Sequence, residues 1–449
     1  MSKQNIIEDY KNRIENSIKN KENIFLRLEK NIDFKNSDGA LGSMIIAIKD
    51  NIMTKGNISS CGSKMLENYV APYTATCIEN LQKNGGIVIG KTNMDEFAMG
   101  STNETSFFGT PTNPFGTNRV TGGSSGGSAV AVAKDLCVAA LGTDTGGSIR
   151  QPAAFCGIVG LKPTYGRISR YGVQSMASSL DQVGTFTKTI DEAEILLKAI
   201  MGFDPKDSQS DKRANELIKS NKKISEYKIA LPKQAFGDGL DPKIKNKILE
   251  TVEKLRAKGV QVDEIDLPIL DYVVSIYYTL MPAEVSTNLS RFDGIRFGLQ
   301  KNTMNYKNIQ DYYFAIRSEG FGEEVKRRIL LGTYILSSSN YEGYYLKAQK
   351  ARQKLIQEMD NIFQKYDLIL TPTTPELAWK IGEKTKDPLK MYLADIYTVP
   401  ANLAGLPAIS IPIGFVEDDG EQMPVGLHLI ANKWQEDDLF VVGRELEKK

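Results

Sequence analysis

The chain of 449 residues contains a single histidine, His428. Histidine is the side chain used most often for acid–base catalysis near neutral pH, so a Ser-His-Asp hydrolase would depend entirely on this residue. His428 lies in VGLHLIA, whose alternating apolar pattern is typical of a half-buried strand residue. The sequence therefore disfavours a histidine-based hydrolase, and a nucleophile in this chain would need another base.

The chain also has few cysteines, almost no net charge and no long apolar run. Formal net charge is +1, which gives no global electrostatic case for binding nucleic acid or an anionic membrane. No run reaches the roughly 18 apolar residues of a membrane helix, and the charged N-terminus does not resemble a secretory signal. The four cysteines form no C-x-x-C pair, which disfavours a zinc site and a disulfide scaffold and predicts reduced thiols in a cytoplasmic protein. They are Cys61, Cys77, Cys137 and Cys156.

Helical and strand-like patterns alternate along the chain. In residues 241–258, Asp241 can cap a helix, Pro242 suits its first turn and Gly259 ends it before a strand over 260–265. The same reasoning predicts strands at 44–50, 87–89 and 367–372, helices at 74–84 and 341–366, a capping box at Thr189–Glu192, and one or two surface helices within 5–33.

These units predict an α/β protein with a central mixed, mostly parallel β-sheet covered on both faces by α-helices. We expect one domain over residues 1–449, with an N-terminal helical region over 1–38. Residues 85–92, GGIVIGKT, match the P-loop pattern. Their β-branched centre favours a strand over a phosphate-binding loop, so we do not expect nucleotide binding there.

Two Gly-Gly-Ser turns, at residues 122–124 and 146–148, flank an apolar segment. A Gly/Ser string alone is often a flexible linker. Here AVAVA follows the first turn at once, which indicates buried backbone packed around a small site. Glycines let backbone N–H groups approach a ligand closely, and a serine on such a turn can be a nucleophile.

Lysine is the remaining common base, and Lys49 ends the apolar segment MIIAIK. At the ordinary lysine pKa of ~10.4, only about one lysine in ~2,500 is neutral at pH 7. Lowering that pKa by ~3 units requires about 4 kcal/mol of differential desolvation, which burial can supply. A solvated lysine at the end of a strand is the alternative interpretation.

The run over residues 122–169 and the motif AIKDNI at 47–52 resemble the amidase signature family of serine hydrolases. This resemblance implies the amidase-signature fold, with its signature core at about 122–169. It also implies a catalytic triad in which Lys49 is the base, Ser124 a bridging serine held by a cis peptide bond, and Ser148 the acylated nucleophile. The backbone N–H groups of Thr145, Gly146, Gly147 and Ser148 would then form the oxyanion hole.

Four further segments resemble the glutaminase A subunits of aminoacyl-tRNA amidotransferases. In those subunits an arginine and an aspartate hold the charged head of glutamine, and the matching positions are Arg328 and Asp395. Arginine grips a carboxylate bidentately, and an aspartate suits an ammonium group. Surface or helix-terminal charges are the alternative for both, and Arg327 is the rival if the alignment shifts by one residue. The segments are residues 94–109, 290–298, 324–337 and 392–414.

The resemblance implies a glutamine amidohydrolase in a cytoplasmic heterotrimer. Its ammonia would convert Glu-tRNA(Gln) to Gln-tRNA(Gln), or Asp-tRNA(Asn) to Asn-tRNA(Asn). The B subunit would use ATP and magnesium and carry most of the tRNA contact, and the C subunit would bridge the other two. No cofactor, metal or membrane is expected for this chain itself. A stand-alone amidase acting on other amides is the alternative, and a non-catalytic scaffold is a third possibility.

The sequence departs from those glutaminase chains at three places. The lysine motif lies closer to the N-terminus, so an N-terminal helix is expected to be short or missing. Thr185 and His428 stand where those chains usually have proline and glutamine. None of these positions belongs to the expected triad.

Overall fold

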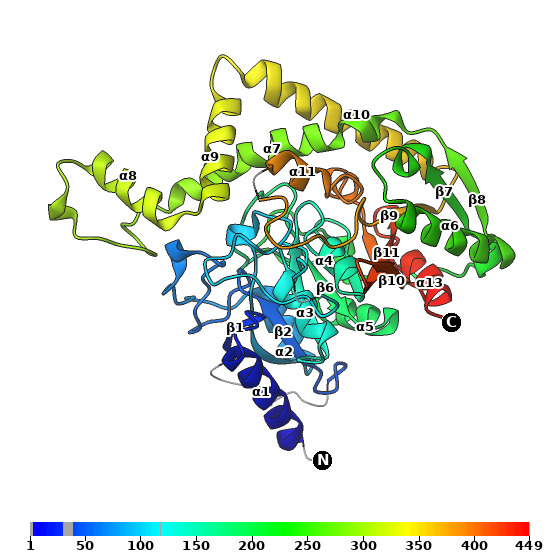
Figure 1. Ribbon diagram of the computed structural model, residues 1–449, viewed down its shortest axis with the longest axis horizontal. Helices are drawn as coiled ribbons and strands as arrows, with labels where there is room; N and C mark the ends of the chain where they lie inside the picture. The colour runs from blue at the N-terminus through cyan, green and yellow to red at the C-terminus, as the bar shows by residue number, and fades with distance from the viewer. Residues whose placement is uncertain (1–2, 30–38, 117, 386, 449) are drawn as a thin grey trace.

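The computed structural model describes residues 3–29, 39–116, 118–385 and 387–448. Within them, eleven strands form one sheet in the order β1-β3-β2-β4-β6-β5-β10-β11-β9-β7-β8 (Figure 1). The strands are β1 Phe25–Leu28, β2 Ile45–Lys49, β3 Ile87–Thr92, β4 Ala139–Asp144, β5 Val159–Lys162, β6 Gln182–Thr187, β7 Lys228–Pro232, β8 Gln261–Ile265, β9 Leu368–Pro372, β10 Ala408–Asp418 and β11 Glu421–Ala431.

Helices cover both faces of this sheet. Helices α2, α5, α6 and α13 share one apolar core with one face. Helices α1 and α3 pack on the other face near β2 and β3, and α4 packs against β5, β10 and β11. Helices α7 and α10 pack near β9 and β11. The helices are α1 Lys3–Lys19, α2 Thr76–Lys83, α3 Gly126–Ala133, α4 Arg150–Phe155, α5 Ile190–Ile200, α6 Pro242–Ala257, α7 Val273–Asn288, α8 Ile309–Gly320, α9 Glu323–Leu336, α10 Lys347–Ile362, α11 Pro388–Leu393, α12 Val399–Leu403 and α13 Glu436–Glu447.

The pleat of β2 aims Lys49 at the face of the sheet that carries α3. Successive strand side chains point to opposite faces. Ile46 and Ile48 enter the core beneath α2 and α5, whereas Ile45 and Ala47 enter the core beneath α3. Lys49 continues the second series, and all five residues of the strand are buried. The alternation therefore places a lysine amine inside the protein, at the carboxyl end of a buried strand.

The expected mixed sheet is confirmed, but the expectation that it is mostly parallel is wrong. Four of its ten described strand pairings are parallel and six are antiparallel. Much of the difference comes from the centre, where β10 and β11 form a hairpin with Asp418 opposite Glu421. Asp419 and Gly420 form its two-residue turn, both at positive φ. An Asp-Gly turn between apolar runs is a hairpin signal that an interpretation based on helix–strand alternation misses.

The expected N-terminal helical region is only partly correct. Helix α1 spans Lys3–Lys19, but Phe25–Leu28 form β1, which pairs antiparallel with β3. The near-helical spacing of apolar residues over 6–18 falls within α1, whereas pairing with β3 makes Phe25–Leu28 a strand. Residues 30–38 of the expected region lie outside the described residues.

Most local expectations are confirmed. Asp241 caps α6, and Thr189 and Glu192 form the capping box of α5. The expected helix over 341–366 begins with one stretch of π-helix, Tyr341–Leu346, before α10. The P-loop-like segment is strand β3, in which Lys91 is buried and donates to the carbonyl of Ile52.

Helices α7, α9 and α10 lie at the top of the view in Figure 1, and α8 projects at the left. The backbones of α7 and α9 cross closely, because a Cβ on Gly332 would overlap the carbonyl oxygen of Pro282 and lie 2.9 Å from the Cβ of Ser286. In the part of the chain described, no helix has both the length and the apolar character needed to cross a bilayer.

We expect Gly332→Ala to lower the free energy of unfolding by about 1–3 kcal/mol, the usual effect of overpacking. The methyl group would force α7 and α9 apart. Urea denaturation of the full chain measures the change. Gly343→Ala is the control, because a Cβ at Gly343 would have no described atom within 4 Å apart from its chain neighbours and its own helix backbone. Equal denaturation midpoints for the two variants would contradict this account of the crossing.

Candidate active site

Three segments meet at one edge of the sheet. Strands β2 and β4 pair in parallel, so their carboxyl ends lie side by side. Lys49 is the last residue of β2, and the turn that carries Ser148 follows β4 directly. Ser124 lies just before α3, which packs against both strands. The topology therefore brings the expected base and both expected serines to the same place.

Lys49 and Ser124 are in direct contact. The Nζ atom lies 2.7 Å from the Oγ of Ser124 and 3.0 Å from the Oγ1 of Thr143, whose carbonyl is 3.4 Å away. Asn51 donates to the same Thr143 hydroxyl at 3.0 Å. The Gly123–Ser124 peptide bond is cis, as the resemblance implies. Every described contact to the amine is a hydroxyl or a carbonyl, and none of them is a carboxylate.

Burial lowers the pKa of Lys49 from 10.5 to about 7. The negative charges of Asp95, Asp144 and Asp181 oppose this shift but do not cancel it. The difference corresponds to roughly 5 kcal/mol in favour of the neutral amine. A large fraction of Lys49 is consequently uncharged at neutral pH, which is the state that a general base requires.

Ser148 is 9% exposed and lies on the turn between β4 and α4. Its hydroxyl makes no hydrogen bond to another residue in the described part of the chain, so the second link of the expected triad, from Ser124 to Ser148, is not formed in this structure. The catalytic roles of Lys49, Ser124 and Ser148 remain predictions.

The two glycines before Ser148 fit tightly. Gly147 has φ +135°, which other residues rarely adopt, and a Cβ there would overlap the hydroxyl of Thr398. A Cβ on Gly146 would lie 2.6 Å from the ring of Tyr277. The Thr398 hydroxyl donates to the Gly146 carbonyl at 2.6 Å. Glycine is therefore required at both positions by the neighbouring side chains.

The expected oxyanion hole needs one correction. The N–H of Gly147 donates to the carboxylate of Asp144 at 2.8 Å, so it is not free to bind a ligand. The Thr145 hydroxyl donates to Asp181 at 2.7 Å. Among the described residues, no acceptor is found for the N–H groups of Gly146 and Ser148. These two amides, with that of Thr145, remain the predicted oxyanion donors.

Arg328 and Asp395 lie in one buried region next to this turn. Arg328, on α9, is 2% exposed, and its Nε donates to Glu324 at 2.8 Å. Its guanidinium lies over the rings of Tyr278 and Tyr392, at 5.5 and 5.4 Å from their centroids. Tyr278 donates its hydroxyl to Asp395 at 2.9 Å. One tyrosine thus contacts both charged residues.

Arg328 has an unsatisfied hydrogen-bond donor, and the pKa of Asp395 is shifted toward neutrality. The Nη2 of Arg328 is buried without a hydrogen-bond partner among the described residues. Burial alone lowers the pKa of Arg328, but Glu324 and the surrounding tyrosines together outweigh it and the pKa is raised, so the group stays charged. Burial raises the pKa of Asp395 to about 7, although Tyr278 and Arg328 oppose the shift. A buried, unpaired donor beside a carboxylate that titrates near neutrality is suited to a zwitterionic ligand.

The rival Arg327 does not reach this region. Its side chain is 47% exposed, against 3% for Arg328, and it pairs with Glu324. The helical turn therefore points Arg328 inward and Arg327 toward solvent, and the alternative interpretation of Arg328 as a surface charge is wrong.

Sequence reasoning missed several contributors. Thr143, Asp144 and Arg150 flank the Ser148 turn, and the segment TDTGGSIR shows them as polar residues on both sides of the glycines. The prediction for that segment is based only on its glycines and serine, and not on these polar residues. Ser101, which donates to both oxygens of Asp395 at 3.2 Å, has no recognisable local signal, because 294 positions separate the two residues.

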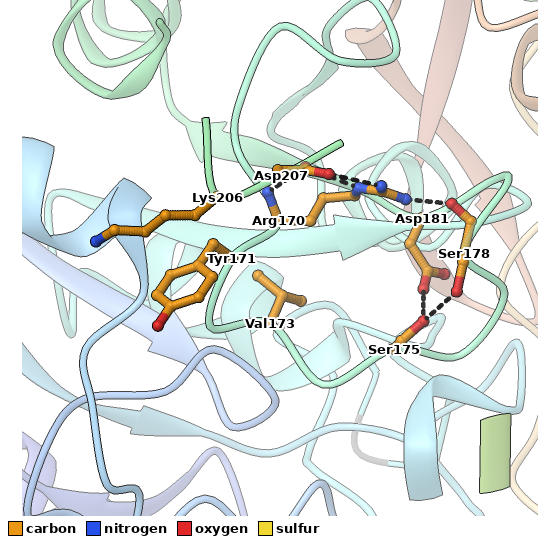
Figure 2. A pocket seen from close by; sticks show the side chains of 8 residues that line it. All are labelled: Arg170, Tyr171, Val173, Ser175, Ser178, Asp181, Lys206 and Asp207. Carbon is orange, nitrogen blue, oxygen red and sulfur yellow. Dashed lines mark hydrogen bonds and ion pairs between the residues drawn. The ribbon is translucent and has the colours of Figure 1, made fainter. Parts of the chain in front are cut away.

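A surface pocket of about 180 Å³ is lined by side chains from residues 170–181 and by Lys206 and Asp207 (Figure 2). Asp181 forms part of its wall and accepts from Thr145, Ser175 and the amide of Met176. Arg170 closes another side through its ion pair with Asp207. The residues described as lining this pocket do not include Ser148. In the described residues, no cluster of histidine, cysteine and carboxylate side chains could hold a metal ion.

Comparisons with known proteins show the family that this chain resembles. The Amidase family profile matches residues 6–440. The A subunit of a glutamyl-tRNA(Gln) amidotransferase from Methylacidiphilum infernorum is 51% identical, covering 91% of this chain and 82% of that protein. One from Clostridium botulinum strain Langeland is 49% identical, covering 97% and 88%. The crystal structure of the equivalent chain from Thermotoga maritima superimposes with a TM-score of 0.79 at 41% identity, covering 95% of this chain and 87% of that one.

We expect Ser148 to react with a neutral acylating probe at a rate that rises with pH through about 7 and then levels off. Below pH 7, Lys49 holds its proton and cannot accept another; above it, the amine is free. A probe without an amino group leaves Asp395 out of the measurement. Stopped-flow labelling from pH 5.5 to 8.5 records the profile.

Lys49→Arg is the control, because a guanidinium keeps its charge at every pH in this range. It should remove labelling throughout. A rate for the unmodified chain that does not change with pH would exclude Lys49 as the base.

Proposed function

Because the chain belongs to the amidase family, on the branch of the glutamyl-tRNA(Gln) amidotransferase A subunits, we propose that it hydrolyses glutamine to glutamate and ammonia. The observation that carries the choice of glutamine is the buried pair Arg328 and Asp395 beside the Ser148 turn. A free amino acid needs one cation and one anion at its head, and the unpaired Nη2 of Arg328 supplies a donor for the carboxylate.

In the proposed acylation step, Ser148 attacks the side-chain carbonyl of glutamine. Its proton passes to Ser124, whose own proton passes to the neutral amine of Lys49. The contact of 2.7 Å between Lys49 and Ser124 supports this route. The amides of Gly146 and Ser148, with that of Thr145, stabilise the oxyanion. Lys49 then returns the proton through Ser124 to the leaving nitrogen, which departs as ammonia.

Deacylation repeats the sequence with water as the nucleophile. Lys49 accepts a proton from water through Ser124, and the hydroxide adds to the acyl carbon. Collapse of the second tetrahedral intermediate breaks the ester bond, and Ser148 recovers its proton. Glutamate is released. The low exposure of Ser148, Arg328 and Asp395 keeps bulk water away from the charged groups and strengthens their interactions with substrate.

We further propose that the chain works in a cytoplasmic heterotrimer with the B and C subunits of the amidotransferase. In this arrangement, the B subunit uses ATP and magnesium to activate the glutamate of Glu-tRNA(Gln), or the aspartate of Asp-tRNA(Asn), and receives the ammonia. A net charge of +1 is compatible with the B subunit making most of the tRNA contact. Four buried free thiols support a reducing compartment.

We expect Ser148→Ala to reduce glutamine-dependent amidation by the co-purified complex at least about a thousandfold, because the nucleophile is lost. Amidation with an ammonium salt should persist, since the partner's chemistry does not need Ser148. Formation of amidated tRNA with each nitrogen donor measures both activities. Ser208→Ala, at an exposed serine, is the matched control. Glutamine use by the Ser148→Ala complex would contradict the mechanism.

We expect Arg328→Gln and Asp395→Asn each to lower kcat/KM for glutamine by about 30- to 1,000-fold, equivalent to about 2–4 kcal/mol for loss of a buried charged partner. Arg327→Gln is the control and should change kcat/KM little, because its side chain faces solvent. Steady-state ammonia release gives these values.

A panel of amides distinguishes glutamine from the alternative substrates. The unmodified chain should use butyramide poorly, because this amide lacks the charged head that Arg328 and Asp395 bind. A preference for apolar amides over glutamine would favour the stand-alone amidase instead.

A further inference from the structure

We propose that His428 is a positioning residue for the nucleophile turn, acting through Arg150 and Asp144. The inference rests on the proposed function, because it takes Ser148 as the nucleophile. His428 lies on β11, fully buried, and far from Ser148 in sequence. Its Nε2 lies 2.9 Å from the Nη1 of Arg150, which begins helix α4 directly after the Ser148 turn.

Every side-chain N–H of Arg150 has a partner, and His428 completes the set. Arginine carries five N–H donors and is always charged in proteins. The Nε donates to one oxygen of Asp144 at 3.0 Å, and one Nη2 hydrogen donates to the other oxygen, also at 3.0 Å. The second Nη2 hydrogen donates to Asn402 at 2.5 Å. The two Nη1 hydrogens donate to the carbonyl of Thr398 at 2.8 Å and to His428.

This arrangement fixes the tautomer of His428. Because Arg150 can only donate, the Nε2 of His428 must be the acceptor and carry no proton. The Nδ1 then carries the proton and donates to the hydroxyl of Thr371, 3.0 Å away. Burial and the positive charges of Arg150 and Lys162 hold the pKa of His428 well below its usual value, against the opposing charge of Asp144. The neutral ring thus serves as a fixed acceptor.

Asp144 connects Arg150 to the backbone of the turn. One carboxylate oxygen accepts from the N–H of Gly147 at 2.8 Å, and the other accepts from the N–H of Ile149 at 3.2 Å. These amides lie on either side of Ser148. Burial alone raises the pKa of Asp144, but Arg150 outweighs it and keeps the pKa well below its usual range. A permanently charged pair therefore clamps both neighbours of the nucleophile, and His428 satisfies the last Arg150 hydrogen.

The proposal predicts which substitutions are tolerated. The amide oxygen of glutamine reaches about as far as Nε2 and can accept from Arg150, whereas its NH₂ can donate to Thr371. Asparagine reaches only as far as Nδ1, so it keeps a group near Thr371 and leaves one Arg150 hydrogen buried and unpaired. An unpaired buried donor is destabilising and loosens the arrangement it belongs to. The pair His428→Gln and His428→Asn thus separates the Arg150 contact from the Thr371 contact.

The first test is NMR of the unmodified full chain, expressed without a histidine tag and labelled with ¹⁵N-histidine. One histidine gives one set of ring signals, so no assignment is needed. We expect a protonated Nδ1 and an unprotonated Nε2, unchanged from pH 5.5 to 8.5. A protonated Nε2, or a ring that titrates in this range, would overturn the proposal without any bearing on the glutaminase assignment.

The second test measures the rate of Ser148 acylation together with kcat and KM for glutamine. We expect His428→Gln to stay within about threefold of the unmodified chain. His428→Asn should lower kcat and the acylation rate by at least about tenfold, because the turn that carries Ser148 is disturbed. KM should stay within about twofold, because Arg328 and Asp395 are not affected. Leu427→Val, a buried change on the opposite face of the same strand, controls for general destabilisation.

Equal rates for His428→Gln and His428→Asn, whether both normal or both slow, would overturn the positioning role. So would a Leu427→Val variant as slow as His428→Asn at the same loss of thermal stability. These outcomes are distinct from failure of the proposed function, which would appear as glutamine hydrolysis that persists in Ser148→Ala.

Discussion

Removal of water from one lysine amine is the constraint on which the site depends. Lys49 is held at the end of a fully buried strand, among hydroxyl and carbonyl groups and without a carboxylate in contact among the described residues. A salt bridge at this position would keep the amine protonated and useless as a base. The acidic groups nearby moderate the downward shift of its pKa but do not reverse it. The sheet therefore sets the chemistry by placing this side chain in its interior.

The turn that carries Ser148 shows a second use of buried charge. Asp144 and Arg150 enclose the turn with a bidentate pair, and the amides on either side of Ser148 bind to that pair. Such an arrangement gives little net stability compared with apolar packing, but it specifies one geometry. Near Asp395, by contrast, Arg328 retains a donor that no described residue accepts. The charged groups around the Ser148 turn thus have all their hydrogen-bond partners, which makes the turn rigid. Arg328 keeps one donor unpaired where a ligand is expected.

Much of this could be predicted from the sequence, for physical reasons. Local signals such as the Asp241 cap, the Thr189 capping box and the apolar segment before Lys49 identified elements correctly, because they act between near neighbours. Strand direction could not be derived this way, since it depends on which distant strands pair. Nor could the link from Ser101 to Asp395, or the engagement of Gly147 by Asp144, which only the folded chain brings about.

The close crossing of α7 and α9 has a consequence for the breadth of substrates. Tyr278 lies on one helix and Arg328 on the other, and the glycine at 332 lets the two backbones touch. The distance between α7 and α9 is therefore set by main-chain contact and not by side chains that could change conformation. A related chain that accepts bulkier amides would need a larger distance between these two helices. Adding a single methyl group at their crossing would be the smallest change that increases this distance.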